Sequence, residues 1–392
     1  MEKVVFVSAK RTPIGKLGGA LASQSAVDLG TIVVKSVLAD AHISKSVVDE
    51  VFMGNVLSAG QGQNPARQVT LRAGLPNTVP ATTINDVCGS GMQALRLGAQ
   101  QIMLGTAHVV IAGGMESMSN APYLIPKGRF GYRYGNAELV DSLYQDGLSD
   151  AFYQYPMGVT AENLLQKYPE SRQAIDQFAL HSQNKAAMAR DKGRFNAEIV
   201  PVTVSDHHGK MYMIDQDEAI RDTSLAKLAK LKPVFKKDGQ VTAGNSSGIN
   251  DGAAAVVMTS EKYAQDHDLS ILGHWSGASL VGVDPAIMGI GPYYAIQKLL
   301  QQTNLDQGAI DLFEINEAFA NQALTVIHQL GIDPQNVNVN GGAIALGHPL
   351  GASGTRIVVT LLHEMQRQAV HSGVASLCIG GGMGAATLIT RK

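Results

Sequence analysis

Cysteine is rare in this chain, so the setting of each thiol is informative. Only two cysteines occur among 392 residues, and Cys88 lies in the stretch NDVCGSG at 85–91. Apolar residues recur at helical spacing from Met92 to Met103, so we expect a buried helix to begin near Ser90. A thiol just before a helix meets unpaired N–H groups and the positive end of the helix dipole, which favour the thiolate. The sequence thus predicts that Cys88 is a nucleophile.

The glycines beside this thiol have two interpretations. Gly89 to Ala94 matches the dinucleotide fingerprint G-x-G-x-x-A, which would indicate a nucleotide-dependent oxidoreductase. That fingerprint contains no thiol, and no acidic residue follows about 20 positions later, where ribose recognition requires one. We therefore favour the alternative, in which Gly89 and Gly91 leave room for a substrate to approach the thiol.

Two further glycine-rich segments carry residues suited to acyl chemistry. His348 lies between Gly347 and Pro349, which restrict its backbone, and an exposed imidazole with a near-neutral pKa suits proton transfer. Cys378 ends an apolar run and precedes three glycines at 380–382. The backbone N–H groups of such glycines can be aimed at an oxyanion.

The remaining polar motifs are less specific. Asn316 follows an apolar run and could cap a helix, or equally position a water or a substrate carbonyl. We expect no metal site, because the cysteines lack C-x-x-C spacing and His207-His208 has no evident carboxylate or thiol partners. The segment 206–209 is instead predicted to form a turn.

The composition limits the partners of the chain and its location. A formal net charge of −2 gives no broad basic field, so we expect neither nucleic acid nor a membrane surface as partner. The first apolar run is too short for a signal peptide, and no run reaches the roughly 20 residues of a membrane helix. With two widely separated cysteines, the chain is expected to be cytoplasmic with free thiols.

The pattern along the chain indicates an α/β fold. Short β-branched runs bounded by glycine alternate with longer helical patterns, which predicts largely buried strands. Residues 48–54 resemble 310–316, and 111–115 resemble 379–383 in the same order, so we interpret the chain as two similar halves. Between them, 119–249 is rich in tyrosines and basic residues and includes a polar helix near 171–192. This change predicts a large insertion that shapes a binding site.

Taken together, these motifs resemble the thiolase family. Cys88 stands in the family's nucleophile segment, His348 in its histidine segment and Cys378 in its second-cysteine segment. The resemblance also covers residues 11–15, 113–118, 242–252 and 316–319, and so spans nearly the whole chain.

The resemblance implies a fold and an organisation. The fold would consist of duplicated βαβαβαββ halves that form a layered α-β-α-β-α core. Residues 1–118 plus 250–270 would form the N-terminal half, and 271–392 the C-terminal half. Residues 119–249 would form an inserted loop domain for coenzyme A (CoA) binding and oligomerisation. A homotetramer, as a dimer of dimers, is implied as well.

The resemblance also implies an activity, that of an acetyl-CoA C-acetyltransferase. Two acetyl-CoA molecules would condense to acetoacetyl-CoA and CoA through an acetyl-Cys88 intermediate, with thiolysis as the reverse and with no cofactor. His348 would take the proton of Cys88 and form one oxyanion site with a water held by Asn316. The backbone N–H groups of Cys88 and Gly380 would form another. Cys378 would be the base that creates the carbanion.

Substrate contacts are implied in the same way. Arg221 would lie near the nucleotide end of CoA, although its segment is one residue shorter than usual and leaves its direction open. The other implied contacts are Leu148, Met157, Leu231, Phe235, Ala243, Ser247, Met288 and Phe319. Pro156 stands where acetyl-specific members often have a histidine, so a 3-ketoacyl-CoA thiolase for longer chains is the alternative. A non-catalytic acyl-CoA or lipid carrier is a more remote one.

Overall fold

The computed structural model describes residues 2–205 and 208–391, and ten of its strands form one sheet. The first half contributes β1 (Val4–Arg11), β2 (Gly15–Lys16), β3 (Glu50–Gly54), β4 (Ala81–Ile84), β5 (Val109–Ser117) and β10 (Asn250–Ser260). The second half contributes β11 (Gly273–Gly282), β12 (Leu312–Ile315), β13 (Ser372–Ile379) and β14 (Met383–Thr390). Their order is β12-β13-β14-β11-β1-β10-β5-β3-β4, with β2 beside β10. Asp206 and His207, in the predicted turn, lie outside the described residues.

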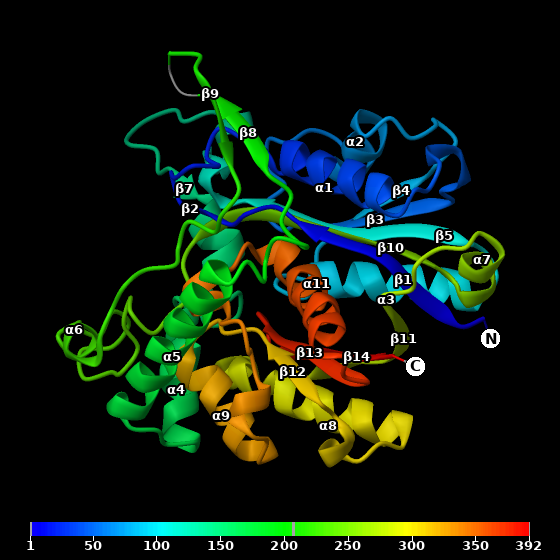
Figure 1. Cartoon of the computed structure of the whole chain (residues 1–392). Coiled ribbons are helices and arrows are strands. Elements are labelled where there is room, and N and C mark those ends of the chain that lie inside the picture. The colour runs from blue at the N-terminus through cyan, green and yellow to red at the C-terminus, as the bar shows by residue number, and fades with distance from the viewer. Residues whose placement is uncertain (1, 206–207, 392) are drawn as a thin grey trace.

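Helices lie on both sides of each half of the sheet (Figure 1). They are α1 (Ala26–Asp40), α2 (Pro65–Arg72) and α7 (Glu261–Asp266) on the first half, α8 (Gly291–Thr303) and α9 (Ala320–Leu330) on the second, and α3 (Ser90–Met103) and α11 (Leu350–Gln368) in the centre. Helix α11 contacts β5 and β10 on one side and β12 and β13 on the other. The predicted layered α/β core is therefore confirmed. No helix of the described residues is long and apolar enough to cross a membrane.

Two aspartates, one in each half of the chain, make the same pattern of hydrogen bonds. Asp49 accepts bonds of 2.6 and 2.9 Å from two successive backbone N–H groups where β5 begins. Asp311 accepts bonds of 2.9 and 2.8 Å from two successive N–H groups where β13 begins. In each half the carboxylate thus ties one strand to the next parallel strand. These aspartates belong to the similar segments 48–54 and 310–316, which therefore occupy matching places.

Other details of the predicted repeat differ. Residues 111–115 lie inside β5, whereas 379–383 span the turn between β13 and β14, so this pair is not equivalent. The second half is also reduced, because a single bridge between Phe313 and Val337 stands where the first half has β4 beside β3. Strings of glycine and apolar residues suit both packed strands and tight turns, so their similarity does not establish equivalence.

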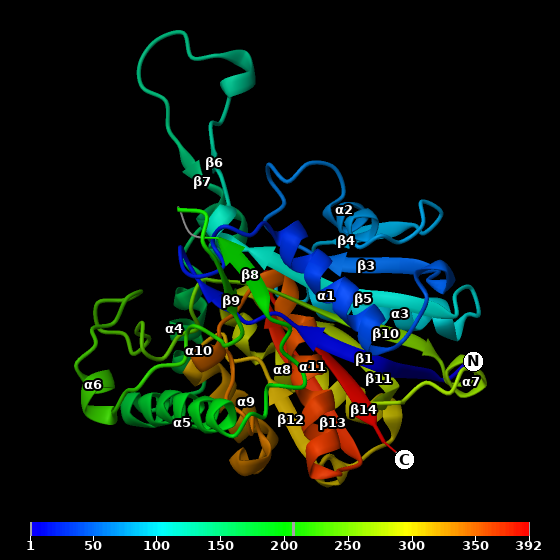
Figure 2. The same ribbon diagram turned by 45° about the horizontal axis from the view of Figure 1, so that its top comes forward.

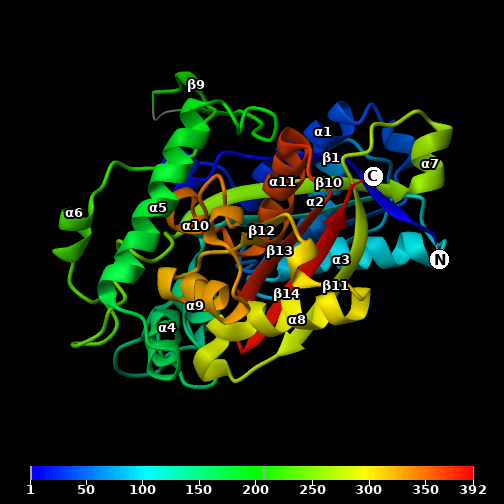
Figure 3. The ribbon, with the colours of Figure 1, turned by 60° about the horizontal axis from the view of Figure 1, so that its bottom comes forward.

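Residues 119–249 are inserted between β5 and β10 and form hairpins and helices. These elements include β6 (Tyr123–Leu124), β7 (Val140–Asp141), β8 (Val202–Ser205), β9 (Met211–Ile214), α4 (Met157–Lys167), α5 (Arg172–Asp191) and α6 (Leu225–Ala229). Figure 2 shows that the loop between β6 and β7 projects away from the layers. Figure 3 shows α5 beside α10 (Ala343–Leu346), which it contacts. The polar helix predicted near 171–192 is thus α5.

A buried charge cluster ties this segment to β1. Arg11 is fully buried and donates hydrogen bonds to Glu198 at 2.6 Å and to Asp217 at 2.7 and 2.9 Å. Burial alone would lower the pKa of Arg11, but the two carboxylates raise it above its ordinary value. The guanidinium stays charged and donates to both carboxylates, and loss of one partner of a buried ion pair is strongly destabilising.

Candidate active site

One apolar cavity of about 940 Å³ collects most of the predicted site residues. It lies where β13 ends and where α3 and α11 begin, because Cys378 is in β13 and Cys88 and His348 directly precede the two central helices. The predicted residues that line it are Cys88, His348, Cys378, Gly380, Leu148, Met157, Phe235, Ala243, Ser247, Met288 and Phe319. We call it the central cavity.

Three predicted residues do not line the central cavity. Asn316 is fully buried directly after β12. Arg221 is exposed, and its Nη2 donates a hydrogen bond of 3.3 Å to the carbonyl of Ala243, which lines the cavity. Leu231 is 39% exposed and its side chain lies against Gly244. Arg221 and Leu231 are therefore next to the cavity wall.

Cys88 lies on a strained turn between β4 and α3. Val87 has a φ of 46°, in the left-handed region that β-branched residues rarely adopt. Ser90 Oγ donates to the carbonyl of Val87 at 2.6 Å and accepts from the N–H of Asp86 at 2.8 Å. Asn85 Oδ1 accepts from the N–H of Val87 at 3.0 Å. These bonds hold the strained turn, which no sequence pattern indicates because valine disfavours a positive φ.

The glycines after Cys88 serve packing. A Cβ on Gly89 would lie 2.5 Å from the side chain of Ile379, and a Cβ on Gly91 would lie 2.7 Å from Oγ1 of Thr355 on α11. The prediction that these glycines open a path for substrate is therefore wrong, because they let α3 approach α11 and β13 closely. The same contacts fill the space that a dinucleotide pyrophosphate would need at this turn.

The thiol of Cys88 is protonated at rest. Burial raises the pKa of Cys88 to about 11, although the N–H groups of Gly380 and of Cys88 itself lower it. Negative charges on Asp86 and Glu116 raise this pKa further. Desolvation therefore outweighs the N–H groups near the helix start, which were expected to favour the thiolate. Attack by Cys88 requires a base that takes its proton.

His348 has the geometry of that base. Its Nδ1 lies 2.5 Å from Ser353 Oγ, and Ser353 Oγ donates to the carbonyl of Pro349 at 2.9 Å. With the hydroxyl proton assigned to that carbonyl, Nδ1–H donates to Ser353. Nε2 is then an unprotonated acceptor, and it is buried without a hydrogen-bond partner among the described residues. The hydrogen-bond network thus selects the tautomer of a general base.

The imidazole differs from the expectation in its exposure and charge. His348 is only 6% exposed, not open to solvent. Burial, together with a smaller effect of the charge of Arg356, lowers the pKa of His348 to about 3. The predicted near-neutral pKa is therefore wrong, because the charged form is desolvated and meets no compensating carboxylate. His348 rests neutral, as a base must.

Cys378 is the second buried thiol of the cavity. It is 1% exposed at the end of β13, and both cysteines are free. Burial raises the pKa of Cys378 well above its ordinary value, and a charge on Cys88 raises it further. The two sulfurs are thus close enough for one charge to oppose the other, and Cys378 also rests as a thiol.

Asn316, directly after β12, has polar side-chain atoms that are available to a water. Its side-chain oxygen and nitrogen are both buried, and neither has a partner among the described residues. Buried amide groups are normally satisfied by protein or by an ordered water. This setting supports water binding more than the alternative of helix capping, since α9 begins four residues later at Ala320.

Two residues that sequence reasoning missed hold these groups in place. Asn250 Oδ1 accepts the backbone N–H of His348 at 2.9 Å, and its Nδ2 donates to the carbonyl of Gly15 at 2.9 Å. Glu116 is a fully buried carboxylate that accepts N–H groups from two separate segments. In the sequence, each of these residues is only a polar residue near one end of an apolar strand. That pattern does not indicate which groups the residue will bind.

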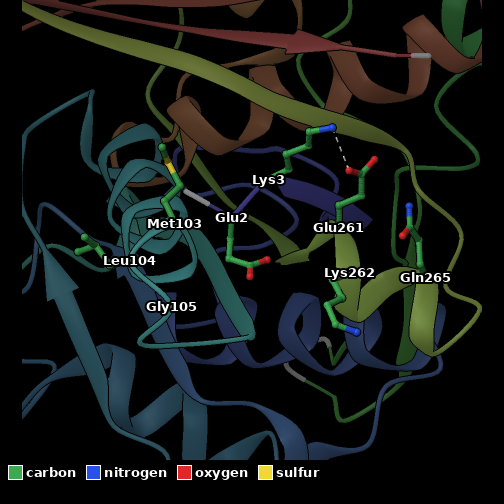
Figure 4. Close-up of a pocket in the computed structure, with 8 residues that line it drawn as sticks. All are labelled: Glu2, Lys3, Met103, Leu104, Gly105, Glu261, Lys262 and Gln265. Atoms are coloured by element: carbon green, nitrogen blue, oxygen red, sulfur yellow. Dashed lines mark ion pairs between the residues drawn. The ribbon is translucent and has the colours of Figure 1, made fainter.

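A second pocket lies at the other end of α3 (Figure 4). It measures about 600 Å³ and is lined by Glu2, Lys3, Met103, Leu104, Gly105, Glu261, Lys262 and Gln265. Lys3 and Glu261 form an ion pair of 3.4 Å there. Helix α3 has 14 residues, so its length of about 20 Å separates this pocket from Cys88. It contains no thiol or imidazole. Across the described residues, no three His, Cys, Asp or Glu side chains group as a metal site would require.

Comparisons with known proteins identify the family. Residues 4–262 match the family model of the thiolase N-terminal domain, and residues 269–391 match that of the thiolase C-terminal domain. The chain belongs to the thiolase family. This thiolase is 53% identical over 390 residues to an acetyl-CoA acetyltransferase of Chromobacterium violaceum, which covers 99% of this chain and 100% of the relative. It is 48% identical over 392 residues to a probable acetyl-CoA acyltransferase of Staphylococcus aureus, with both chains fully covered.

Solved structures agree with this thiolase in fold. The Bacillus anthracis acetyl-CoA acetyltransferase matches with a TM-score of 0.97 at 44% identity. Human mitochondrial 3-ketoacyl-CoA thiolase matches with a TM-score of 0.97 at 46% identity. Each comparison covers 100% of this chain and 99% of the other. The family and the fold expected from the sequence motifs are therefore confirmed.

Proposed function

We propose that this thiolase is an acetyl-CoA C-acetyltransferase, which condenses two acetyl-CoA molecules to acetoacetyl-CoA and CoA and catalyses the reverse thiolysis. The observation that carries the proposal is the meeting of two free thiols and one neutral imidazole at a single apolar cavity. The 53% identity to a protein named acetyl-CoA acetyltransferase supports the choice of acyl group.

In the first half-reaction, Cys88 becomes acetylated. His348 Nε2 takes the thiol proton as Cys88 Sγ attacks the thioester carbonyl, and the C–S bond to CoA breaks. The departing CoA sulfur takes a proton from Cys378, so free CoA leaves and a thiolate remains on Cys378. The positive charge on His348 balances that thiolate. The N–H groups of Cys88 and Gly380, which already lower the pKa of the Cys88 sulfur, are placed to stabilise the oxyanion.

In the second half-reaction, the thiolate of Cys378 removes a methyl proton from a second acetyl-CoA. The high pKa of Cys378, raised by burial, makes this thiolate a strong base. The carbanion forms a C–C bond to the acetyl carbonyl and displaces Cys88, which recovers its proton from His348. Atoms and charges balance without a cofactor. We assign the enolate oxygen to His348 and to a water held by Asn316, whose amide atoms are available.

Residues of 119–249 supply most of the proposed CoA site. Leu148, Met157, Phe235, Ala243 and Ser247 line the central cavity, and their apolar surface suits the pantetheine arm. Arg221 and Leu231 lie beside this wall, where Arg221 would meet the charged nucleotide end. Met288 and Phe319 complete the wall near the acyl group.

The same segment supports the proposed organisation and assembly. We propose a division into 1–118 plus 250–270, 119–249 and 271–392. The projecting β6–β7 hairpin exposes the side chains of Tyr123, Ile125, Phe130, Tyr134 and Leu139. Exposed apolar groups of this kind favour association, so we propose that the loop joins two dimers into a homotetramer.

The two free thiols favour a reducing compartment, for which we propose the cytoplasm.

Activity on longer chains is the second candidate. Pro156 lines the central cavity, and one matching structure is a 3-ketoacyl-CoA thiolase. A series of 3-ketoacyl-CoA substrates in the thiolysis direction decides between them. We expect the highest kcat/KM for acetoacetyl-CoA, and a higher value for medium or long chains would reverse the assignment.

The decisive test follows the covalent intermediate. Incubation with radiolabelled acetyl-CoA, followed by digestion, should place the label on the peptide that contains Cys88. Cys88→Ser should carry none. A non-catalytic carrier would bind acetyl-CoA without forming this adduct. Absence of label on the wild-type peptide, despite binding of acetyl-CoA, would refute the proposed acyl transfer.

A further inference from the structure

Glu116, near the end of β5, is a buried carboxylate that the steps above do not use. It is 0% exposed, and its Oε1 accepts hydrogen bonds from Asn55 Nδ2 at 2.9 Å and from the N–H of Leu57 at 3.1 Å. Its Oε2 accepts from the N–H of Val56 at 3.1 Å and from the N–H of Gly351 at 2.8 Å. The carboxylate therefore connects the loop after β3 with the first turn of α11.

Glycines make this connection short. A Cβ on Gly114 would lie 2.0 Å from the carbonyl oxygen of Gly351, and a Cβ on Gly54 would lie 2.6 Å from the same atom. Strands β5 and β3 thus meet the start of α11 with no side chain between them. Early N–H groups of a helix lack intrahelical partners, and a carboxylate there also meets the positive end of the helix dipole. Glu116 satisfies such a group in a site closed to water.

Both segments joined by Glu116 support the central cavity. His348 lies three residues before Gly351, and Leu350 between them lines the cavity. A Cβ on Gly147 would lie 3.0 Å from the side chain of Leu350 and 3.4 Å from that of Leu57. Leu57 and Leu350 therefore support the same part of the cavity wall, from the two segments that the carboxylate joins.

We propose that Glu116 is a positioning residue for acyl transfer, and that its four N–H contacts hold the first turn of α11, and with it His348, in register with Cys88. The inference rests on the proposed function. In this proposal Glu116 does not contact substrate. It acts through the backbone of α11 and through its own negative charge.

The charge of Glu116 gives a second, independent readout. A negative charge on Glu116 raises the pKa of Cys88, so its removal should make the thiol easier to ionise. The titratable groups on the elements around Glu116 are Asp251 on β10, Cys88 before α3 and His348 before α11. Burial raises the pKa of Glu116 to about 7, while its N–H partners lower it and Asp251 raises it further. Measurements at about pH 8.5 therefore compare an ionised Glu116 with its neutral replacement.

The test uses the full-length chain with Glu116→Gln. The amide presents one acceptor and one NH₂ group to four donors, so the backbone N–H groups lose acceptors. We expect kcat to fall about tenfold or more, because buried N–H groups left without an acceptor shift the start of α11 and with it His348. KM for acetyl-CoA should stay within about twofold, because the CoA contacts lie elsewhere. Alkylation of Cys88 by iodoacetamide should become faster while circular dichroism shows that the variant is fully folded, because unfolding would also expose the thiol and speed its alkylation.

A matched control and a second variant complete the experiment. Asp311→Asn removes another carboxylate that accepts two backbone N–H groups, at the opposite end of the sheet. It should lower the unfolding midpoint while kcat and alkylation stay unchanged. Glu116→Asp keeps the charge but shortens its reach, so kcat should fall with alkylation of Cys88 unchanged, and this variant decides the matter if Glu116→Gln does not fold.

Two outcomes would overturn the assignment of Glu116. One is an unchanged kcat in Glu116→Gln or, if that variant does not fold, in Glu116→Asp. The other is a lower kcat and a faster alkylation in Glu116→Gln that both follow the unfolded fraction of the variant. Failure of the proposed function would give a different result from failure of this inference. Wild-type Cys88 would then not be acetylated by acetyl-CoA but would still react with iodoacetamide.

Discussion

Cys88 and His348 occupy equivalent places in the two halves of the chain. Each lies two residues before the first residue of a central helix, Cys88 before α3 and His348 before α11, and these two helices pack against each other. The duplication therefore brings the thiol and the imidazole to one cavity from residues 260 positions apart in sequence. The same place in each of the two similar halves thus carries a different group, a thiol in the first half and an imidazole in the second.

The two thiols should be separable by mutation. Cys378→Ser should still form the acetyl-Cys88 adduct, because His348 remains to take the proton of Cys88. Condensation should fall by about 10²- to 10⁴-fold, since a hydroxyl is a far weaker general base at this position. Single-turnover labelling and steady-state condensation measure the two steps. Loss of labelling together with condensation would contradict the division of roles.

The hydroxyl of Ser353 should matter through the tautomer of His348. Ser353→Ala removes the acceptor of Nδ1–H, so the proton is no longer held away from Nε2. We expect acetylation of Cys88 to slow by about tenfold or more, with KM for acetyl-CoA nearly unchanged. Ser376→Ala is the matched control, because Ser376 is a buried serine whose hydroxyl donates to the carbonyl of Ala385 at 2.7 Å. Equal effects in both variants would show that packing, not the tautomer, is responsible.

The buried neutral imidazole should make the protein less stable in acid. The pKa of His348 falls from 6.5 to about 3 on folding, so between these values the unfolded chain binds a proton that the folded chain does not. The contribution of His348 to the free energy of unfolding therefore decreases as pH falls through this window, by about 1.4 kcal/mol per unit. Urea unfolding of wild type and His348→Asn at about pH 6 and pH 4 should show the wild type losing more stability. Parallel losses would refute the assignment of a neutral His348.

The Arg11 cluster should be a major source of stability that activity does not require. Asp217→Asn leaves the guanidinium with one carboxylate, and we expect the free energy of unfolding to fall by about 3 kcal/mol. Denaturant unfolding measures this change. Asp266→Asn, which removes the exposed partner of Lys262, is the control and should leave the midpoint where it was. Equal unfolding midpoints for Asp217→Asn and Asp266→Asn would mean that other groups balance the charge of Arg11.

The sequence by itself determined the family and predicted the reactive residues. The two cysteines and His348 in their glycine-rich segments indicated the chemistry, and helical spacing placed the start of α3 at Ser90, where the structure has it. Such features are local, because a residue type and its periodic neighbours are written within about 15 positions. The repeat of 48–54 at 310–316 likewise predicted the matching strands β3 and β12.

Only the tertiary structure decided how those residues are charged and held. Both thiols and the imidazole rest neutral because segments far apart in sequence cover them, and desolvation exceeds what the nearby N–H groups provide. Gly91 proved to be a packing residue because α11 crosses α3 there. The partners of Glu116 and Ser353 also depend on where α11 begins. Burial and hydrogen bonding are properties of the assembled layers, so no local pattern could specify them.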